Sequence, residues 1–419
     1  MHIDLNAFFA RCEEIRNPSY EKVPLGIGTR GRSGIISTCN YEARKYGVRS
    51  GQPTFMADRK CPNLILVPPD FSYYKRMSNQ FFNFIRRYST TIEIVSIDEC
   101  FVDMTSILSR TQNVELFLKD HQNSLYRETK LRCSIGIAPT KWLAKMASDL
   151  KKPMGITICR RKDIPNLIYP LPIESFWGIG NKSSPKLKEY GIKTIGDLAN
   201  MVNKKDPFVM SLLGKFYFTV KEWINGGGSD VVDPNPSEPK SIGNQETLSK
   251  DCSSYEEIED DLYNLAVEVS SRAKQAKKLG YTITFQIKDT CFKLHSKAHS
   301  LSSPTNDATT LFNTSKDLYK QYFEGIRIRL IGISLSRLED IKKDDNQLNL
   351  FNYQEYEEIE KTDKLISSLN RKLKKKALIR ASTSSIDKID GSLSGSLGLS
   401  TLILEKFINS LFDRYKKKL

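Results

Sequence analysis

Two adjacent carboxylates inside an apolar stretch constrain this chain more than any other feature. Residues 95–103 read VSIDECFVD, a pattern typical of a buried strand, with Asp98 and Glu99 set into it. Side chains alternate along a strand, so the two carboxylates either face opposite sides or splay apart at a bend. Burying an unpaired carboxylate is costly, so a cation is expected beside them. The alternative is a hydrogen-bonded structural pair.

A third carboxylate ends another short apolar strand at the N-terminus. Residues 1–10 read MHIDLNAFFA and predict a strand and its turn, with Asp4 at the strand's end. Three carboxylates on neighbouring strand ends suit Mg²⁺, which takes few protein ligands together with substrate phosphates. We expect Asp4, Asp98 and Glu99 to hold two Mg²⁺ ions about 3.5–4 Å apart. The backbone carbonyl of Leu5 would complete one coordination shell.

Donors for a triphosphate follow in the sequence. Residues 40–47 predict a short helix, with Asn40 as its N-cap. We expect four side chains around the carboxylates to donate hydrogen bonds to phosphate oxygens: Thr38, Tyr41, Arg44 and Lys152. The alternative for Tyr41 and Arg44 is an ordinary turn of a surface helix.

Two aromatic rings follow Asp4 by four and five residues. Successive side chains diverge, so one ring of Phe8 and Phe9 is expected in the core. The other could lie under a sugar and exclude a 2′-hydroxyl. Plain core packing of both rings is the alternative.

The whole chain is strongly basic. Its 419 residues hold 64 Lys and Arg against 49 Asp and Glu, a formal net charge of +15, which favours a polyanion partner over a merely basic protein. The length predicts roughly two to four domains. Eight cysteines without a C-x-x-C pair argue against a zinc site or a disulfide framework and favour a reducing cytoplasm. The sequence contains neither a signal peptide nor an apolar run of about 18 residues, so no membrane association is predicted.

The middle of the chain carries a glycine motif. Gly178 and Gly180 form a G-x-G turn before a helix, and its N–H groups could face a phosphate. The motif resembles a helix-hairpin-helix, which clamps a DNA backbone without reading sequence; an ordinary helical turn is the alternative. Residues 229–239 are rich in proline and are expected to form a linker.

Residues 240–340 predict a β-α-β-β-α-β order. Ser254 and Glu257 read as a capping box that opens a helix reaching about residue 278. In such a sheet the helices cover one face and the strands expose the other.

Basic side chains fall on the predicted open face. Arg327 and Arg329 share a face of the last strand, with Lys288 and Lys293 expected on neighbouring strands. That face suits phosphate contacts. A solvated basic face is the alternative.

The polar tail, residues 341–419, contains an apolar pair. Residues 347–351 read QLNLF, and Leu350 and Phe351 have no core of their own nearby in the sequence. With Gln347 at the rim, the segment looks like a docking peptide. Packing of the pair against the preceding domain is the alternative.

Four ordered motifs resemble the Y-family translesion DNA polymerases, and within them the bacterial DinB (DNA polymerase IV) type. They cover residues 4–10 (DLNAFFA), 37–44 (STCNYEAR), 96–99 (SIDE) and 136–155 (GIAPTK…KPMG). Cys100 stands where relatives frequently have a small Ala. The resemblance spans about residues 1–340. It implies an α+β multidomain right hand, whose parts would be the palm (1–10 and 70–155), fingers (11–69), thumb (156–228) and little finger (240–340).

The resemblance also implies a function. The expected reaction is template-directed DNA synthesis past damaged bases, by transfer from a dNTP to a primer 3′-OH with low fidelity and no proofreading. Phe9 would be the steric gate against ribonucleotides, and residues 347–351 would bind a sliding clamp. A monomer acting on primer-template DNA in the bacterial cytoplasm, at the nucleoid, is expected.

Two other functions stay open on the sequence. One is a catalytically inactive scaffold that binds clamp and DNA; the intact Asp4, Asp98 and Glu99 argue against it. The other is a metal-dependent nuclease or nucleotidyl cyclase, which the basic C-terminal domain disfavours. Primer extension discriminates among them.

Overall fold

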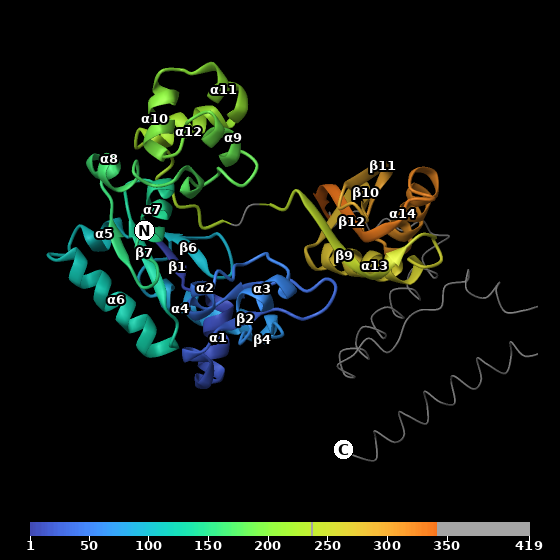
Figure 1. The fold of residues 1–419 in the computed structure, drawn as a ribbon, viewed down its shortest axis with the longest axis horizontal. Helices are drawn as coiled ribbons and strands as arrows, with labels where there is room; N and C mark the ends of the chain where they lie inside the picture. The colour runs from blue at the N-terminus through green and yellow to red at the C-terminus, as the bar shows by residue number, and fades with distance from the viewer. Residues whose placement is uncertain (236–237, 342–419) are drawn as a thin grey trace, which may run out of the picture. The chain divides into compact units, whose positions relative to one another are not determined.

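The computed structural model describes residues 1–235 and 238–341, and the described residues pack into four apolar cores (Figure 1). One core runs from residues 3 to 135, and a small one lies within residues 36–64. A helical core spans residues 142–224, and the last spans residues 242–335. No helix in the described ranges is long and apolar enough to cross a membrane.

A five-stranded sheet organises the N-terminal part. Its order is β5-β6-β1-β7-β8, and β1 pairs antiparallel with both β6 and β7. The bounds are β1 His2–Leu5, β5 Ile92–Ile94, β6 Glu99–Val102, β7 Cys133–Ile137 and β8 Ile156–Ile158. The odd-numbered side chains of β1 join the core formed with α4 (Phe71–Arg86) and α6 (Val114–Thr129). The even-numbered ones face the other side, because strand side chains alternate.

The stretch around the paired carboxylates is not the single strand that its apolar pattern predicts. β5 and β6 form a hairpin, and Asp98 lies in the connecting turn while Glu99 opens β6. The N–H groups of Val95 and Ser96 both donate to the carbonyl of Glu99, at 3.1 and 3.3 Å. The turn forms the bend that lets the two carboxylates splay apart.

Helix α1 spans Phe8–Arg16 and begins two residues after β1. Ala7 precedes it with φ 48°, and no side chain caps its N-terminus. Phe8 and Phe9 therefore stand on the first turn of a helix.

A small three-stranded sheet, in the order β3-β2-β4, follows α1. Its strands are β2 Leu25–Ile27, β3 Thr38–Cys39 and β4 Ile65–Val67, and its helices are α2 Tyr41–Lys45 and α3 Thr54–Lys60. Strand β3 has only two residues, and just before it the Ile36 N–H donates to the carbonyl of Gln52 at 2.9 Å. Asn40 is the N-cap of α2, as predicted: its side chain accepts from the Ala43 N–H at 2.9 Å.

Short helices build the third core. They are α8 Ile164–Leu167, α9 Ser184–Glu189, α10 Ile195–Asn203, α11 Pro207–Leu213 and α12 Phe216–Ile224. This core includes Trp142 from α7 (Lys141–Asp149), so α7 joins the helical part to the five-stranded sheet.

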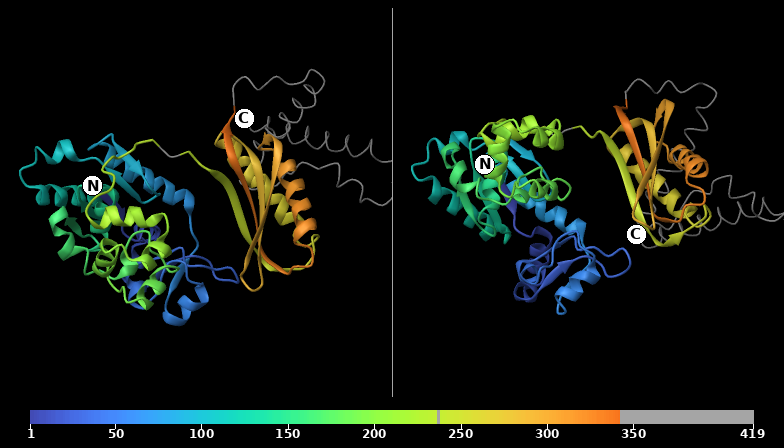
Figure 2. Two further views of the ribbon diagram at one scale, coloured as in Figure 1. Left: turned by 90° about the horizontal axis from the view of Figure 1, so that it is seen from above. Right: turned by 45° about the horizontal axis from the view of Figure 1, so that its top comes forward.

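The C-terminal sheet has the order β11-β10-β12-β9, with the predicted β-α-β-β-α-β succession. Its elements are β9 Ser241–Cys252, α13 Glu259–Gln275, β10 Lys278–Asp289, β11 Leu294–Thr305, α14 Ala308–Tyr322 and β12 Ile328–Asp340. Both helices cover one face of the sheet (Figure 2). The predicted capping box is wrong: α13 starts at Glu259, and Glu257 instead accepts from the Ser253 N–H.

Helix α7 lies against β7 and β1 on the face opposite α4 and α6. Gly136 of β7 permits this close approach. A Cβ there would lie 2.0 Å from the carbonyl oxygen of Ala144 and 2.5 Å from the N atom of Ser148, both in the backbone of α7. The backbone cannot yield to such a contact without moving the helix.

Gly136→Ala should therefore lower the free energy of unfolding by about 1–3 kcal/mol, through overpacking. Chemical denaturation checks this. Gly180→Ala is the matched control, since a Cβ at Gly180 meets nothing within 4 Å. Equal stability of the Gly136 and Gly180 variants would contradict the close seating of α7.

Candidate active site

Strand pairing brings the three predicted carboxylates to one place. Asp4 of β1 lies directly opposite Glu99 of β6 in the register. The Leu5 N–H donates to the carbonyl oxygen of Asp98 at 3.0 Å, which fixes the turn against the end of β1. Residues far apart in sequence thus meet at one edge of the sheet.

Two lysines approach this edge from α7 and the segment after it. Lys145 forms ion pairs with Glu99 and, at 3.6 Å, with Asp4. Lys152 Nζ lies 2.7 Å from Asp4 Oδ1 and 2.7 Å from Asp149 Oδ1. Burial by itself would lower the pKa of Lys152, but the carboxylates of Asp4 and Asp149 raise it. In this structure the two ammonium groups balance Asp4 and Glu99.

Asp98 differs from its two neighbours. Within the described residues it has no ion-pair partner, and its side chain accepts a hydrogen bond from the Ser96 hydroxyl. Burial raises the pKa of Asp98; the Ser96 hydroxyl opposes this, and the charges of Asp4 and Glu99 add to it. The site therefore holds a half-buried carboxylate whose negative charge calls for a cation. Across residues 1–235 and 238–341, no three His, Cys, Asp or Glu side chains converge closely enough to hold a metal ion.

A buried histidine supports Glu99 and was missed by the sequence reasoning. His2 Nε2 lies 3.5 Å from Glu99 Oε2, and His2 Nδ1 is 2.9 Å from the Ser148 hydroxyl of α7. The contact with His2 outweighs burial and, with Lys145, lowers the pKa of Glu99 to about 2. The available signal was spacing: His2 and Asp4 are two apart on a strand, so they share a face.

Phe8 and Phe9 diverge on α1. Phe8 is 3% exposed and belongs to the core, whereas Phe9 is half-buried. The Phe9 ring stacks on Tyr74 of α4, with centroids 4.5 Å apart and planes 14° from parallel. The Tyr74 hydroxyl donates to Glu13 at 2.9 Å. Phe9 therefore packs against the buried ring of Tyr74, and the hydrogen bond to Glu13 holds that ring in position.

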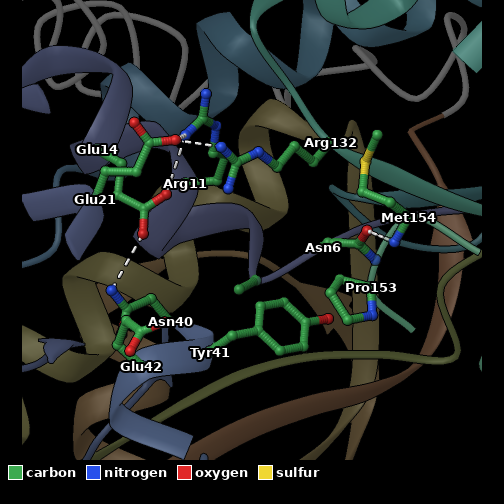
Figure 3. A pocket seen from close by; sticks show the side chains of 11 residues that line it. Asn6, Arg11, Glu14, Glu21, Asn40, Tyr41, Glu42, Arg132, Pro153 and Met154 are labelled. Carbon is green, nitrogen blue, oxygen red and sulfur yellow. Dashed lines mark hydrogen bonds and ion pairs between the residues drawn. The ribbon is translucent and has the colours of Figure 1, made fainter. Parts of the chain in front are cut away.

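The predicted phosphate donors lie on the small sheet and its helix. Tyr41 lines a cavity of ≈200 Å³ together with residues from α1 and with Pro153 and Met154, which follow Lys152 (Figure 3). The Arg44 guanidinium stands 4.7 Å from the centre of the Tyr41 ring. Thr38, on β3, is half-buried and does not line this cavity.

Asn6 ties the Lys152 segment to β1. Its Oδ1 accepts from the Met154 N–H at 2.8 Å, and its amide donates to the Ser134 hydroxyl at 3.0 Å (Figure 3). Asn6 is almost fully buried. Its hydrogen bonds hold the segment that brings Lys152 to Asp4.

The glycine turn before α9 lies at the surface of the helical part, with Gly178 and Gly180 both exposed. Gly178 has φ 103°, and a Cβ there would lie 2.4 Å from the Phe216 ring, so glycine is required. Trp177 is stacked on Trp223, with centroids 5.5 Å apart. Gly178, Gly180 and Trp177 line an open groove that also includes Asp149 of α7.

The basic residues of the C-terminal sheet are less uniform than predicted. Arg329 lies on β12, but its guanidinium is 4.7 Å from the centre of the Phe292 ring and 4.0 Å from Asp251. Arg327 is exposed just before β12, and Lys293 lies in the turn before β11 rather than on a strand. The predicted clamp peptide, with Gln347, Leu350 and Phe351, lies outside the described residues.

Comparisons with known proteins agree on one family. Residues 3–149 match the impB/mucB/samB family, residues 161–192 its helix-hairpin-helix (HHH) motif, and residues 239–350 its C-terminal domain. The chain is 37% identical to a protein named DNA polymerase IV from Bacillus velezensis, over 88% of this chain and 89% of that one. It is 35% identical to DNA polymerase IV 1 of Bacillus subtilis, over 91% and 92%.

Solved structures give the same result. A Y-family DNA polymerase chimera of Dbh and Dpo4 superposes with a TM-score of 0.70 at 25% identity, covering 81% of this chain and 99% of that one. The resemblance predicted from the four motifs is confirmed. The chain therefore belongs to the impB/mucB/samB family, the Y family of DNA polymerases, beside the bacterial members named DNA polymerase IV.

Proposed function

We infer that this chain is a template-directed DNA polymerase that synthesises DNA past damaged bases. The family supports this reading. The observation that carries it in this chain is the meeting of Asp4, Asp98 and Glu99 at the edge of β1 and β6. A catalytically inactive scaffold is not favoured, because such a chain has no need to keep a half-buried Asp98 beside two other carboxylates without a cation of its own.

The ligand types present suit Mg²⁺, although in the described residues the three carboxylates do not converge into a three-ligand group. Carboxylates and a backbone carbonyl are preferred ligands of Mg²⁺. We propose that Asp4, Asp98, Glu99 and the carbonyl of Leu5 hold two Mg²⁺ ions. When bound, the ions would activate the primer 3′-hydroxyl and neutralise charge on the phosphates.

The chain's own residues would orient the dNTP. Tyr41, which lines the cavity, and Arg44 beside it would offer donors to phosphate oxygens, and Lys152 would add an ammonium group next to Asp4. The N-terminus of α1 carries no capping side chain, so its first N–H groups are available to a phosphate. Thr38 is proposed as a further donor. Because Asn6 holds the Lys152 segment, these donors are in place before the nucleotide binds.

DNA would be held by the other parts of the chain. In this proposal residues 1–10 and 70–155 are the palm, 11–69 the fingers, 156–228 the thumb, and 240–340 the little finger after a linker at 229–239. Gly178 and Gly180 would present N–H groups to a DNA backbone, and Arg327 with Arg329 would contact phosphates. Residues 347–351 would bind a sliding clamp. The protein would act as a monomer in the bacterial cytoplasm, at the nucleoid.

Asp98→Ala should reduce dNTP incorporation below about a tenth of wild type and leave affinity for primer-template DNA nearly unchanged. The reason is that the carboxylate serves the metal, whereas basic side chains elsewhere hold the DNA. Primer extension and fluorescence anisotropy measure the two quantities. Extension on undamaged and abasic templates tests the lesion-bypass activity in the same assay. An Asp98→Ala protein with more than a tenth of wild-type turnover would refute the proposed metal site.

Phe9→Ala should increase incorporation of ribonucleotides while dNTP use is roughly kept. Phe9 is the half-buried ring of the pair and is backed by Tyr74, so it can resist a 2′-hydroxyl. The ratio of kcat/KM for rNTP and dNTP is the measurement. Phe8→Ala is the matched control, since that ring is in the core. If Phe8→Ala relaxes sugar selection instead, the two roles are reversed.

A further inference from the structure

Glu14 is a buried carboxylate in the wall of the cavity that Tyr41 also lines. It lies on α1 and is 7% exposed. Its Oε1 accepts from the Asn40 side-chain amide at 3.1 Å, and its Oε2 accepts from Arg11 at 3.1 Å (Figure 3). Glu14 therefore joins α1 to the residue that begins α2.

Asn40 uses its whole side chain in hydrogen bonds. Its Oδ1 accepts from the N–H groups of Ala43 at 2.9 Å and Leu25 at 3.1 Å. Its Nδ2 donates to Glu14 and, at 2.9 Å, to the Val23 carbonyl. A carboxylate and a backbone carbonyl only accept, so Glu14 and the Val23 carbonyl together favour the orientation in which Nδ2 faces α1 and Oδ1 faces α2.

That orientation determines whether α2 is capped. The helix spans only Tyr41–Lys45, too short to be stable by itself. It depends on the Asn40 cap, whose loss typically costs about 1 kcal/mol. Tyr41 and Arg44 both stand on this single turn.

We propose that Glu14 is a positioning residue for nucleotide binding: through Asn40 it fixes the helix that carries Tyr41 and Arg44. The inference rests on the proposed role of these two side chains toward the triphosphate. Losing the Glu14–Asn40 contact would let the amide turn and α2 fray, so that the donors must be ordered by each incoming dNTP. The cost would fall on dNTP binding rather than on the chemical step.

The same network supplies a matched control. Glu21 accepts from Arg11 at 3.0 Å and also from Arg132, so it shares the ionic network with Glu14. It makes no contact with Asn40 among the described residues, and its side chain is 38% exposed, against 7% for Glu14. Removing Glu21 perturbs the charges near Arg11 but leaves the cap of α2 intact.

The experiment measures single-nucleotide incorporation and separates KM for dNTP from kcat. Glu14→Ala should raise KM about fivefold, the equivalent of a lost cap, with kcat within about twofold of wild type. Asn40→Ala, which removes the capping oxygen and the amide donor together, should do the same and serves if Glu14→Ala does not fold. Glu14→Gln keeps an acceptor for Asn40 and should restore most of the affinity. Glu21→Ala should leave KM unchanged.

Arg44→Ala separates the two levels of the inference. If it raises KM and a folded Glu14→Ala protein does not, the positioning role is wrong while the nucleotide role of α2 stands. Where Glu14→Ala does not fold, an unchanged KM in Asn40→Ala overturns the positioning role instead. An unchanged KM in Arg44→Ala overturns both. A Glu21→Ala protein with the same defect as Glu14→Ala would also overturn the positioning role, because the effect would then belong to the charge network.

Discussion

The repulsion among three carboxylates is the constraint on which the rest of this structure depends. Pairing of β1 with β6 places Asp4 opposite Glu99, and the hairpin turn adds Asp98. Such a group is tolerated only beside positive charge. Helix α7 and the segment after it supply Lys145 and Lys152, which pair with two of the carboxylates. The close seating of α7 on the sheet is therefore a condition for the site as well as for the fold.

Helix α1 links this centre to both walls of the proposed nucleotide site. Its uncapped N-terminus lies two residues after β1, the strand that carries Asp4. Two consecutive buried glutamates then diverge: Glu13 holds the Tyr74 hydroxyl behind Phe9, and Glu14 holds Asn40 at the start of α2. Helix α1 thus connects Phe9, the residue proposed to contact the sugar, with α2, the helix proposed to contact the triphosphate. Buried carboxylates of this kind are costly unless each is hydrogen-bonded, and both are.

The carboxylate centre could be predicted from the sequence because acidic residues in apolar strands have few explanations. The turn at Asp98 could not, since a hairpin interrupts residues whose side chains all look strand-like. Gly136 and His2 were missed for another reason. Their roles arise from contacts with α7, and the local sequence pattern around a residue does not show which distant helix will pack against it. The false capping box at Ser254 shows the limit of a short motif, because Glu257 finds a backbone donor in a turn instead.

Counting bound Mn²⁺, as a spectroscopic substitute for Mg²⁺, tests the central claim most directly. The sample is the protein with a dNTP and a primer-template whose primer lacks the 3′-hydroxyl, and electron paramagnetic resonance reports free and bound metal. Wild type should bind about two ions per complex. Asp98→Asn, which keeps the shape of the side chain and removes its charge, should lose at least one of them. Equal binding by both proteins would contradict the assignment of Asp98, Asp4 and Glu99 as the metal centre.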